Sequence, residues 1–159
     1  MMDEKTKKTA LRMIGYGVYV LGVDHEGDVD FATMTWLTQS SFKPPLIAVA
    51  IRKETRPNDL VRKSGRFAVS FLAKDQVELA RIFAKPVDVE KESVQGAPFG
   101  RTDGGAPILV EAPAWIEAEV RSVDDRGDHS LVLAEVTDAR IVHDAEPLSL
   151  AETGMNYGG

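Results

Sequence analysis

The amino-acid sequence predicts a mainly β protein, an antiparallel closed barrel with short peripheral helices. At least six segments have the branched and aromatic residues typical of strands. Only short helices fit between them, which leaves little room for the repeated right-handed crossovers of a parallel sheet. Neither G-x-G-x-x-G after a strand nor G-x-x-x-x-G-K-[ST] occurs. A Rossmann sheet and a P-loop fold are therefore disfavoured.

The first third of the chain is expected to hold one helix and one hairpin. Residues 4–13 have the pattern of a short helix, with Asp3 as its N-cap. The segment GVYVLGV (17–23) is rich in branched and aromatic residues and is followed by DHEGD, so a hairpin should turn near residues 24–28. Its second strand continues into the stretch FATMTWLTQSSFKPPLIAVAI (31–51).

The middle of the chain reads as strand, helix, strand and helix. Residues 46–51 are an apolar run after a double proline, which indicates a buried strand. A short helix should open at Pro57 and close at Gly65, and the segment RFAVSFL after it should be a strand. Asp75 followed by Glu78 resembles a capping box and predicts a helix over QVELARIFA.

The last third combines a long loop with two further strands. Prolines and glycines interrupt every pattern in residues 85–105, so a loop is expected there, and loops of this length are often lids or binding loops. Residues 114–123 and 130–142 read as two strands joined by DDRGD. The tail ending ETGMNYGG shows no periodicity.

Composition excludes several classes of function. The 159 residues suffice for a single domain, 1–159, with a core that needs no disulfide or metal. No cysteine is present and the three histidines lack paired spacing, so we expect no metal and no thiol chemistry. A net charge of −6 argues against a nucleic-acid binder. No apolar run or signal-peptide core is seen, which predicts a cytoplasmic protein without a membrane partner.

The hydroxyl-rich run after residue 31 allows two interpretations. In a strand Thr33 and Thr35 would point to one face, and Met34 and Trp36 to the other. The simpler interpretation is an exposed strand face and a loop, since threonine favours strands and serine favours turns. The functional interpretation is a neutral wall against a planar heterocycle, because ligand pockets are mostly apolar with a few placed polar groups.

Two further positions carry candidate chemistry. Arg52, Lys53, Thr55 and Arg56 form a basic, hydroxyl-bearing loop at the end of a strand, which would suit a phosphate or would simply be solvated. His129 stands where a turn becomes an apolar strand. It can present one ring nitrogen to a carbonyl or phosphate, or it can be a turn residue without a role.

An ordered set of segments resembles the flavin reductase-like, FMN-binding split-barrel family. The segments cover the chain from about residue 17 to its end: ATMTWLTQSSFKPPLIAVAI, RKETRPNDLVRKSGRFAVSFL, LARIFA, GDHSLVLAEV and TGMNYGG. The resemblance implies a split, Greek-key-like antiparallel β-barrel that forms a homodimer. It also implies bound FMN, with FAD or riboflavin as alternative flavin substrates, and NADH or NADPH as hydride donor.

The resemblance also assigns residues. It implies that His129 lies on the nicotinamide side, in the role of a catalytic residue that aligns the nucleotide. Its implied flavin-binding set comprises the isoalloxazine and ribityl wall, the phosphate loop and the end of a closing helix: Thr33, Met34, Thr35, Trp36, Ser40, Ser41, Arg52, Lys53, Thr55, Phe83, Ala84 and Lys85. Trp36 departs from the small residue of many relatives and would shield one flavin face or narrow access.

The function implied is an NAD(P)H:flavin oxidoreductase in which the cofactors carry the chemistry and the protein supplies stacking, orientation and electrostatics. Reduced flavin would pass to a monooxygenase partner, to oxygen or to another electron acceptor. Two alternatives stay open: an FMN-binding electron carrier without nucleotide turnover, and a split-barrel oxidoreductase with FMN as a fixed prosthetic group. Fold resemblance alone does not separate them.

Overall fold

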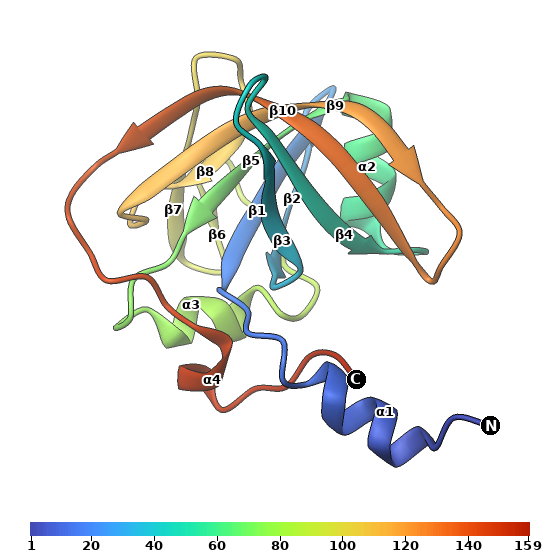
Figure 1. The fold of residues 1–159 in the computed structure, drawn as a ribbon. Helices are drawn as coiled ribbons and strands as arrows, with labels where there is room; N and C mark the ends of the chain where they lie inside the picture. Colours follow the sequence, from blue (N-terminus) through green and yellow to red (C-terminus); the bar gives the residue numbers. More distant parts are fainter.

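The computed structural model describes residues 1–159 and is built mainly from antiparallel strands (Figure 1). The strands are β1 Tyr19–His25, β2 Asp28–Met34, β3 Leu37–Ser41, β4 Leu46–Arg52, β5 Arg66–Phe71, β6 Ser93–Val94, β7 Ala97–Arg101, β8 Pro107–Leu109, β9 Ala114–Asp124 and β10 His129–Ile141. The helices are α1 Glu4–Leu11, α2 Arg56–Ser64, α3 Val77–Ile82 and α4 Leu150–Thr153. The predicted fold class, a mainly β split barrel with short helices, is confirmed.

Seven strands form one strongly curled sheet in the order β2-β1-β5-β9-β10-β4-β3. Its edge strands β2 and β3 are consecutive in the chain, yet they are not paired with each other. The link between them, Thr35 and Trp36, is instead attached to β4 through the Ala50 N–H, which donates to the Trp36 carbonyl at 2.9 Å. The barrel is therefore split at the hydroxyl-rich run.

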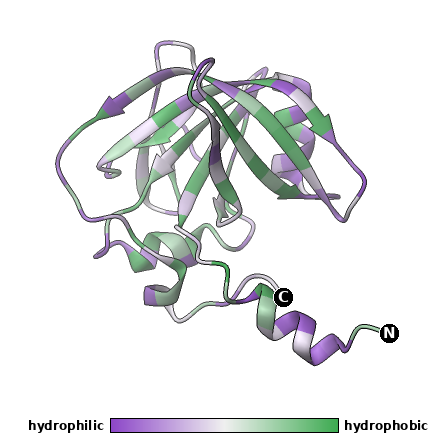
Figure 2. Ribbon diagram, viewed as in Figure 1, coloured by the Kyte–Doolittle hydropathy of each residue, from purple (hydrophilic) through white to green (hydrophobic).

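The helix ends follow local chemistry. Asp3 caps α1 by accepting from the Thr6 N–H at 2.8 Å, as predicted. Gly65 ends α2 in the left-handed conformation (φ 69°), also as predicted. Figure 2 shows that α1 is mostly hydrophilic, and it projects from the barrel beside the C-terminus with no buried residue.

One prediction for a helix end is wrong, and one helix end in the tail is not predicted. The expected capping box at Asp75 does not form, because Gln76 is the N-cap of α3 and its side chain instead accepts from the Ala73 N–H. In the tail, which shows no periodicity, Ser149 and Glu152 make a capping box that starts α4. A serine followed three residues later by glutamate was visible in the sequence as its signal.

The expectation of an unstructured loop over residues 85–105 is also wrong. The segment contains β6 and β7, which pair with β8 in a separate three-stranded sheet. Gln95 and Gly96 both have positive φ, 49° and 81°, and make the two-residue hairpin turn between β6 and β7. Residues 85–87 alone remain at the edge of a pocket described below.

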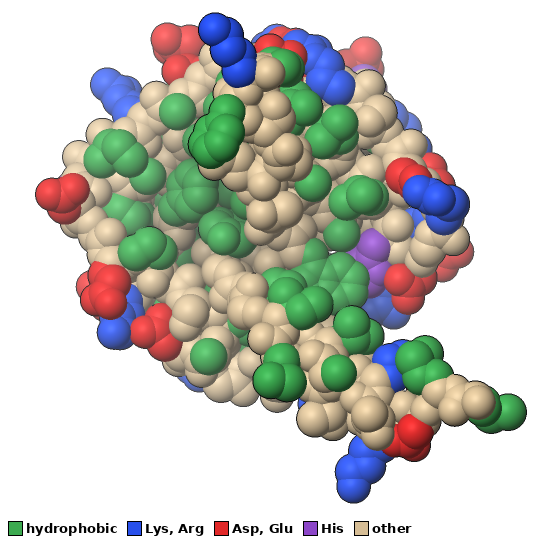
Figure 3. Space-filling view, in the orientation of Figure 1, with side chains coloured by type: hydrophobic (Ala, Val, Ile, Leu, Met, Phe, Trp, Pro, Cys, Tyr) green, Lys and Arg blue, Asp and Glu red, His purple; other side chains and the backbone are tan.

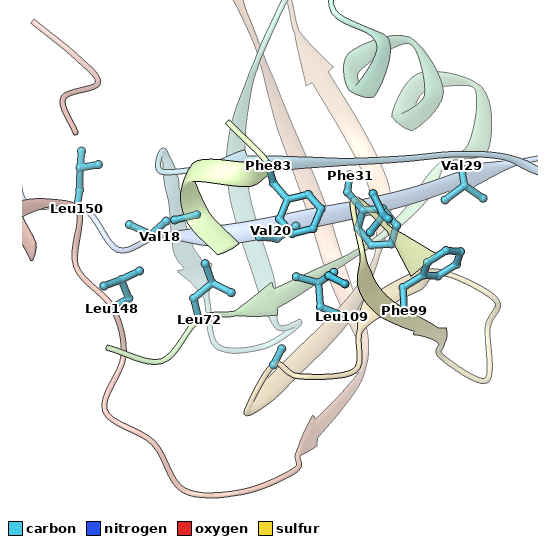
Figure 4. Packing of buried hydrophobic residues seen from close by; sticks show 14 residues of the cluster. Val18, Val20, Val29, Phe31, Leu72, Phe83, Phe99, Leu109, Leu148 and Leu150 are labelled. Atoms are coloured by element: carbon cyan, nitrogen blue, oxygen red, sulfur yellow. The ribbon is translucent and has the colours of Figure 1, made fainter. Parts of the chain in front are cut away.

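Two hydrophobic clusters stabilise the fold. One lies inside the curled sheet and under α2, and includes Leu21, Val49 and Phe67. The other joins the sheet to α3, to the three-stranded sheet and to the tail; Figure 4 shows Phe31, Phe83 and others of its residues packed together. The Phe31 and Phe83 rings are 5.9 Å apart. This second cluster fixes α3 against the strand that carries the hydroxyl-rich run.

Candidate functional site

The main pocket lies at the split of the barrel. It has a volume of about 560 Å³ and opens where β2 ends, where β4 ends, after α3 and beneath the C-terminal tail. About half of its lining is apolar, as is usual for small-molecule sites. Nine of the twelve predicted flavin-binding residues line it: Thr33, Met34, Thr35, Trp36, Arg52, Thr55, Phe83, Ala84 and Lys85.

The end of β2 forms one wall of the pocket. Thr33 ties this wall to α3, since its hydroxyl donates to the Ala80 carbonyl at 2.7 Å and its N–H donates to the Phe83 carbonyl at 2.9 Å. Its hydroxyl proton is used within the chain, which leaves its oxygen as an acceptor for a ligand. Phe83 itself is almost fully buried in the core, so its ring serves mainly to hold α3 in place.

Two polar atoms in this wall have no hydrogen-bond partner. The Thr35 hydroxyl and the Trp36 indole N–H are both buried, and both residues line the pocket. A buried donor without a partner costs about 1–3 kcal/mol. Such atoms persist where a ligand can satisfy them, so this wall fits a planar heterocycle that carries acceptor atoms.

The loop after β4 forms the charged end of the pocket. Arg52 and Lys85 line it, are exposed, and form no salt bridge. Thr55 donates its hydroxyl to the Arg52 carbonyl at 2.7 Å, which tightens the loop. Arg56 is occupied by Asp28 and by Asp30, to which its Nη1 lies at 3.5 Å. The cations available to an anion are therefore Arg52 and Lys85.

Asp30 is a buried carboxyl group at the edge of the pocket. Burial raises its pKa, and the Phe31 N–H and the Arg56 guanidinium oppose that rise. The Phe31 N–H donates to Asp30 Oδ1 at 2.9 Å. The sequence pattern does not point to Asp30, because an acidic residue close to the polar turn DHEGD gives no sign of burial.

Three predicted residues lie away from the pocket. Lys53 donates to the Asp125 carbonyl. Ser40 and Ser41 lie on β3, and Ser41 is paired with Leu46 at the start of β4, whereas the pocket is at the other end of β4. Leu46 lies four residues before Ala50, the first β4 residue that lines the pocket, which is about 13 Å along the strand. No contact in the structure assigns these three residues to the pocket.

His129 is beside the pocket but does not line it. It is paired with Arg52 across β10 and β4, so both side chains leave the same face of the sheet. Its ring packs on Trp36 with centroids 4.5 Å apart. Nδ1 lies 2.7 Å from Asp128, and Nε2 is hydrogen-bonded to the Tyr157 hydroxyl. Both ring nitrogens therefore have partners within the chain.

The C-terminal tail covers this part of the site. Met155, Asn156 and Tyr157 line the pocket, and the Tyr157 ring packs edge-on against Trp36 with centroids 5.0 Å apart. None of these three residues was singled out as a site residue. Their signal was a lone aromatic residue in a polar, glycine-rich ending.

Comparison with known proteins gives a consistent picture. The family model described as "Flavin reductase like domain" matches residues 11–159. The NADH-dependent flavin reductase StyB of Pseudomonas fluorescens is 32% identical over 137 residues, which cover 86% of this chain and 78% of that protein. Other relatives are longer, and the chain spans 43% of one of them.

Solved structures share the fold over most of the chain. The styrene monooxygenase flavin reductase of Pseudomonas putida S12 superposes with a TM-score of 0.78 at 28% identity, covering 99% of this chain and 97% of that one. An FMN-binding protein from Thermus thermophilus superposes with a TM-score of 0.72 at 31% identity, covering 81% and 72%. The structure contains no helix long and apolar enough to cross a membrane.

Proposed function

The chain belongs to the flavin reductase-like domain family and is a flavin reductase, and we propose that it holds FMN in the pocket at the split of the barrel. We propose a reduced nicotinamide nucleotide, NADH or NADPH, as the electron donor. Bound flavin supplies the redox chemistry by accepting a hydride from that nucleotide. The residues of the chain bind and orient the two cofactors and keep water from the reacting faces.

The unsatisfied donors at the split carry this proposal. The Thr35 hydroxyl and the Trp36 indole N–H are buried without partners, in a pocket whose lining is half apolar. A heterocycle with carbonyl and ring-nitrogen acceptors fits such a wall. Thr33 contributes an acceptor oxygen, since its proton is donated to Ala80. The wall is therefore neutral and offers both donors and acceptors.

The charged end suits the phosphate that distinguishes FMN from riboflavin. Arg52 and Lys85 are free of carboxylate partners, and both line the pocket. A phosphate accepts charge-assisted hydrogen bonds from such cations. Arg56 shapes this loop through Asp28 and Asp30 and is less available for a ligand. We therefore assign the phosphate to Arg52 and Lys85, with Thr55 holding the loop.

The side of the pocket near Trp36 is proposed for the nicotinamide. Tyr157 lines the pocket there with its ring edge and its hydroxyl, and His129 packs behind it on Trp36. Their contribution is alignment, because hydride transfer needs the two rings held in contact at the correct orientation. No acid, base or nucleophile of the chain is required for that step.

The test of this function is a flavin titration combined with nucleotide oxidation. The purified chain should bind FMN and oxidise NADH or NADPH in a flavin-dependent manner. If it neither takes up FMN nor oxidises either nucleotide, the proposal is refuted. Bound FMN that neither nucleotide reduces would instead favour the electron carrier, and reduced FMN that stays bound and reacts with another small molecule would favour the fixed prosthetic group.

The assembly and setting are also proposals. We propose a cytoplasmic homodimer, formed by 1–159 as one domain, that delivers reduced flavin to a monooxygenase or another acceptor. Exposed apolar side chains support an interface, among them Phe42, Ile141 and Val142. On the face shown in Figure 3, hydrophobic side chains gather toward the middle and charged ones around the rim. Light scattering of the purified chain measures the oligomeric state, and a monomer at all concentrations would refute the dimer.

A further inference from the structure

Tyr157, and not His129, forms the wall of the pocket on the proposed nicotinamide side. Tyr157 lines the pocket, whereas His129 lies behind it with its ring against Trp36. The two are joined through His129 Nε2 and the Tyr157 hydroxyl, and His129 Nδ1 lies 2.7 Å from Asp128 Oδ1. A hydrogen-bonded chain therefore runs from the surface carboxylate Asp128 through His129 to a phenol at the pocket.

The direction of the protons in this chain follows from Asp128. The hydrogen bond from His129 holds the pKa of Asp128 below its usual value, so this exposed carboxylate is ionised and accepts. His129 Nδ1 therefore donates to Asp128, and in the tautomer that carries its proton on Nδ1 the other ring nitrogen, Nε2, is an acceptor. Burial raises the pKa of Tyr157, so its phenol keeps the proton and donates it to Nε2. With its proton donated to Nε2, the Tyr157 oxygen can act toward a ligand only as an acceptor.

The position of Tyr157 is fixed from both sides. Its ring packs edge-on against Trp36 and against His129, with centroids 5.0 and 5.8 Å away. Beyond it, the Gly158 carbonyl accepts from Arg12 Nε at 3.2 Å, which attaches the tail to the end of α1. The acceptor is therefore held in place before any ligand arrives, as specific recognition requires.

A primary amide donor is the group that matches this acceptor. The nicotinamide ring carries a carboxamide, and the NH₂ of this carboxamide is the hydrogen-bond donor group of the ring. Tyr157 is partly exposed near the mouth, where a nucleotide that exchanges at each turnover would enter. On the proposed function, we infer that Tyr157 determines specificity for the nicotinamide carboxamide: its oxygen accepts a hydrogen bond from the carboxamide NH₂, and His129 and Asp128 are positioning residues for it.

An analogue that lacks the donor tests this directly. In 3-acetylpyridine adenine dinucleotide a methyl group replaces the amide NH₂. The unmodified chain, loaded with FMN, should bind nicotinamide dinucleotide about 3- to 10-fold more tightly than this analogue, the range expected for one net hydrogen bond. Titration calorimetry with the oxidised nucleotides measures the ratio, and steady-state turnover with the reduced forms measures the same preference in KM.

The variant Tyr157→Phe keeps the ring and removes the oxygen. It should bring the preference close to one by weakening the binding of nicotinamide dinucleotide, while FMN affinity stays near that of the unmodified chain. Tyr16→Phe is the matched control, because Tyr16 also packs on Trp36, with centroids 6.4 Å apart, but is not part of the chain to Asp128. Tyr16→Phe should keep the full preference. Thermal unfolding of both variants checks that the fold is intact.

Three results would overturn the inference. An unchanged preference of Tyr157→Phe for nicotinamide dinucleotide over the acetylpyridine analogue would show that the phenol does not accept a hydrogen bond from the carboxamide. A loss of FMN affinity would show that it contacts the flavin. A lower KM for both nucleotides in the variant would show that the tyrosine obstructs their site. If the unmodified chain binds FMN but neither nucleotide, the proposed function itself is refuted. This result is seen without any variant, so it is distinguishable from the three results above, which refute only the role of Tyr157.

Discussion

Replacing Arg52 by alanine should weaken FMN binding while leaving riboflavin binding nearly unchanged. The two flavins differ in the phosphate, so the ratio of their affinities isolates the contact to that group. Arg52 lines the pocket and forms no salt bridge within the chain, so no internal pair must break before it binds an anion.

The size of the effect follows from the exposure of Arg52. A hydrogen bond to a charged group contributes about 1.5–3 kcal/mol, and solvent around an exposed guanidinium reduces this to about 1–2 kcal/mol. Since about 1.4 kcal/mol is tenfold, Arg52→Ala should lower FMN affinity about 5- to 30-fold. Lys85→Ala should give a smaller loss, because an ammonium cannot make the bidentate contact of a guanidinium.

Lys53→Ala is the matched control. Lys53 follows Arg52 in the sequence, yet its Nζ donates to the Asp125 carbonyl and it does not line the pocket. Quenching of flavin fluorescence on titration with the protein gives both affinities, and added salt should reduce the FMN preference of the unmodified chain. Equal losses for FMN and riboflavin in Arg52→Ala, or an equal loss of FMN preference in Lys53→Ala, would refute the assignment of the phosphate.

Two predictions concern the fold around the pocket. Gly22→Ala should lower the free energy of unfolding by about 1–3 kcal/mol in urea, since an added Cβ would lie 2.1 Å from the Pro107 carbonyl oxygen; an unaffected midpoint would contradict this close approach. Arg56→Met should destabilise the chain by about 1 kcal/mol at neutral pH, because it leaves the buried Asp30 carboxylate without its cation. Because burial raises the pKa of Asp30, the protonated carboxyl contributes to stability below about pH 4, and this contribution is lost as the pH rises through the pKa of the folded state. Arg56 opposes the rise in this pKa, so it reduces the cost of ionising Asp30. The loss in Arg56→Met should therefore grow from pH 4 toward pH 7 in urea melts, and a loss independent of pH would count against it.

The elements that were predicted well have a strong local signal. The hairpin of β1 and β2 follows from branched residues on both sides of a glycine turn, and α2 follows from Pro57 and Gly65 at its two ends. The three-stranded sheet was missed because its strands are short and contain proline and glycine. Pairing across the sheet stabilises them, for example through the Pro98 carbonyl, which accepts from the Val110 N–H. A pattern of single residues does not reveal such a pairing.

The sequence predicts the candidate site well where consecutive residues line the pocket. It predicts the site less well where the fold places neighbouring residues on different sides of a strand or loop. Adjacent strand residues point to opposite faces, and Arg52 and Lys53 stand where β4 ends and lie on different sides of the loop. Ser40 and Ser41 belong to the same run as Thr35, but β3 carries them away from the split. Tyr157 reaches the pocket from the end of the chain, a long-range contact that spacing cannot show.

Anaerobic reduction of protein-bound FMN by NADH and NADPH distinguishes a nucleotide-dependent flavin reductase from an FMN carrier. The chain is first loaded with one equivalent of FMN, separated from free flavin, and mixed with each nucleotide without oxygen. The absorption of oxidised flavin should disappear with at least one nucleotide. A variant of the charged end, Arg52→Ala with Lys85→Ala, should retain less FMN before mixing. Bound FMN that stays oxidised with both nucleotides, or a double variant that retains FMN as well as the unmodified chain, would contradict these predictions.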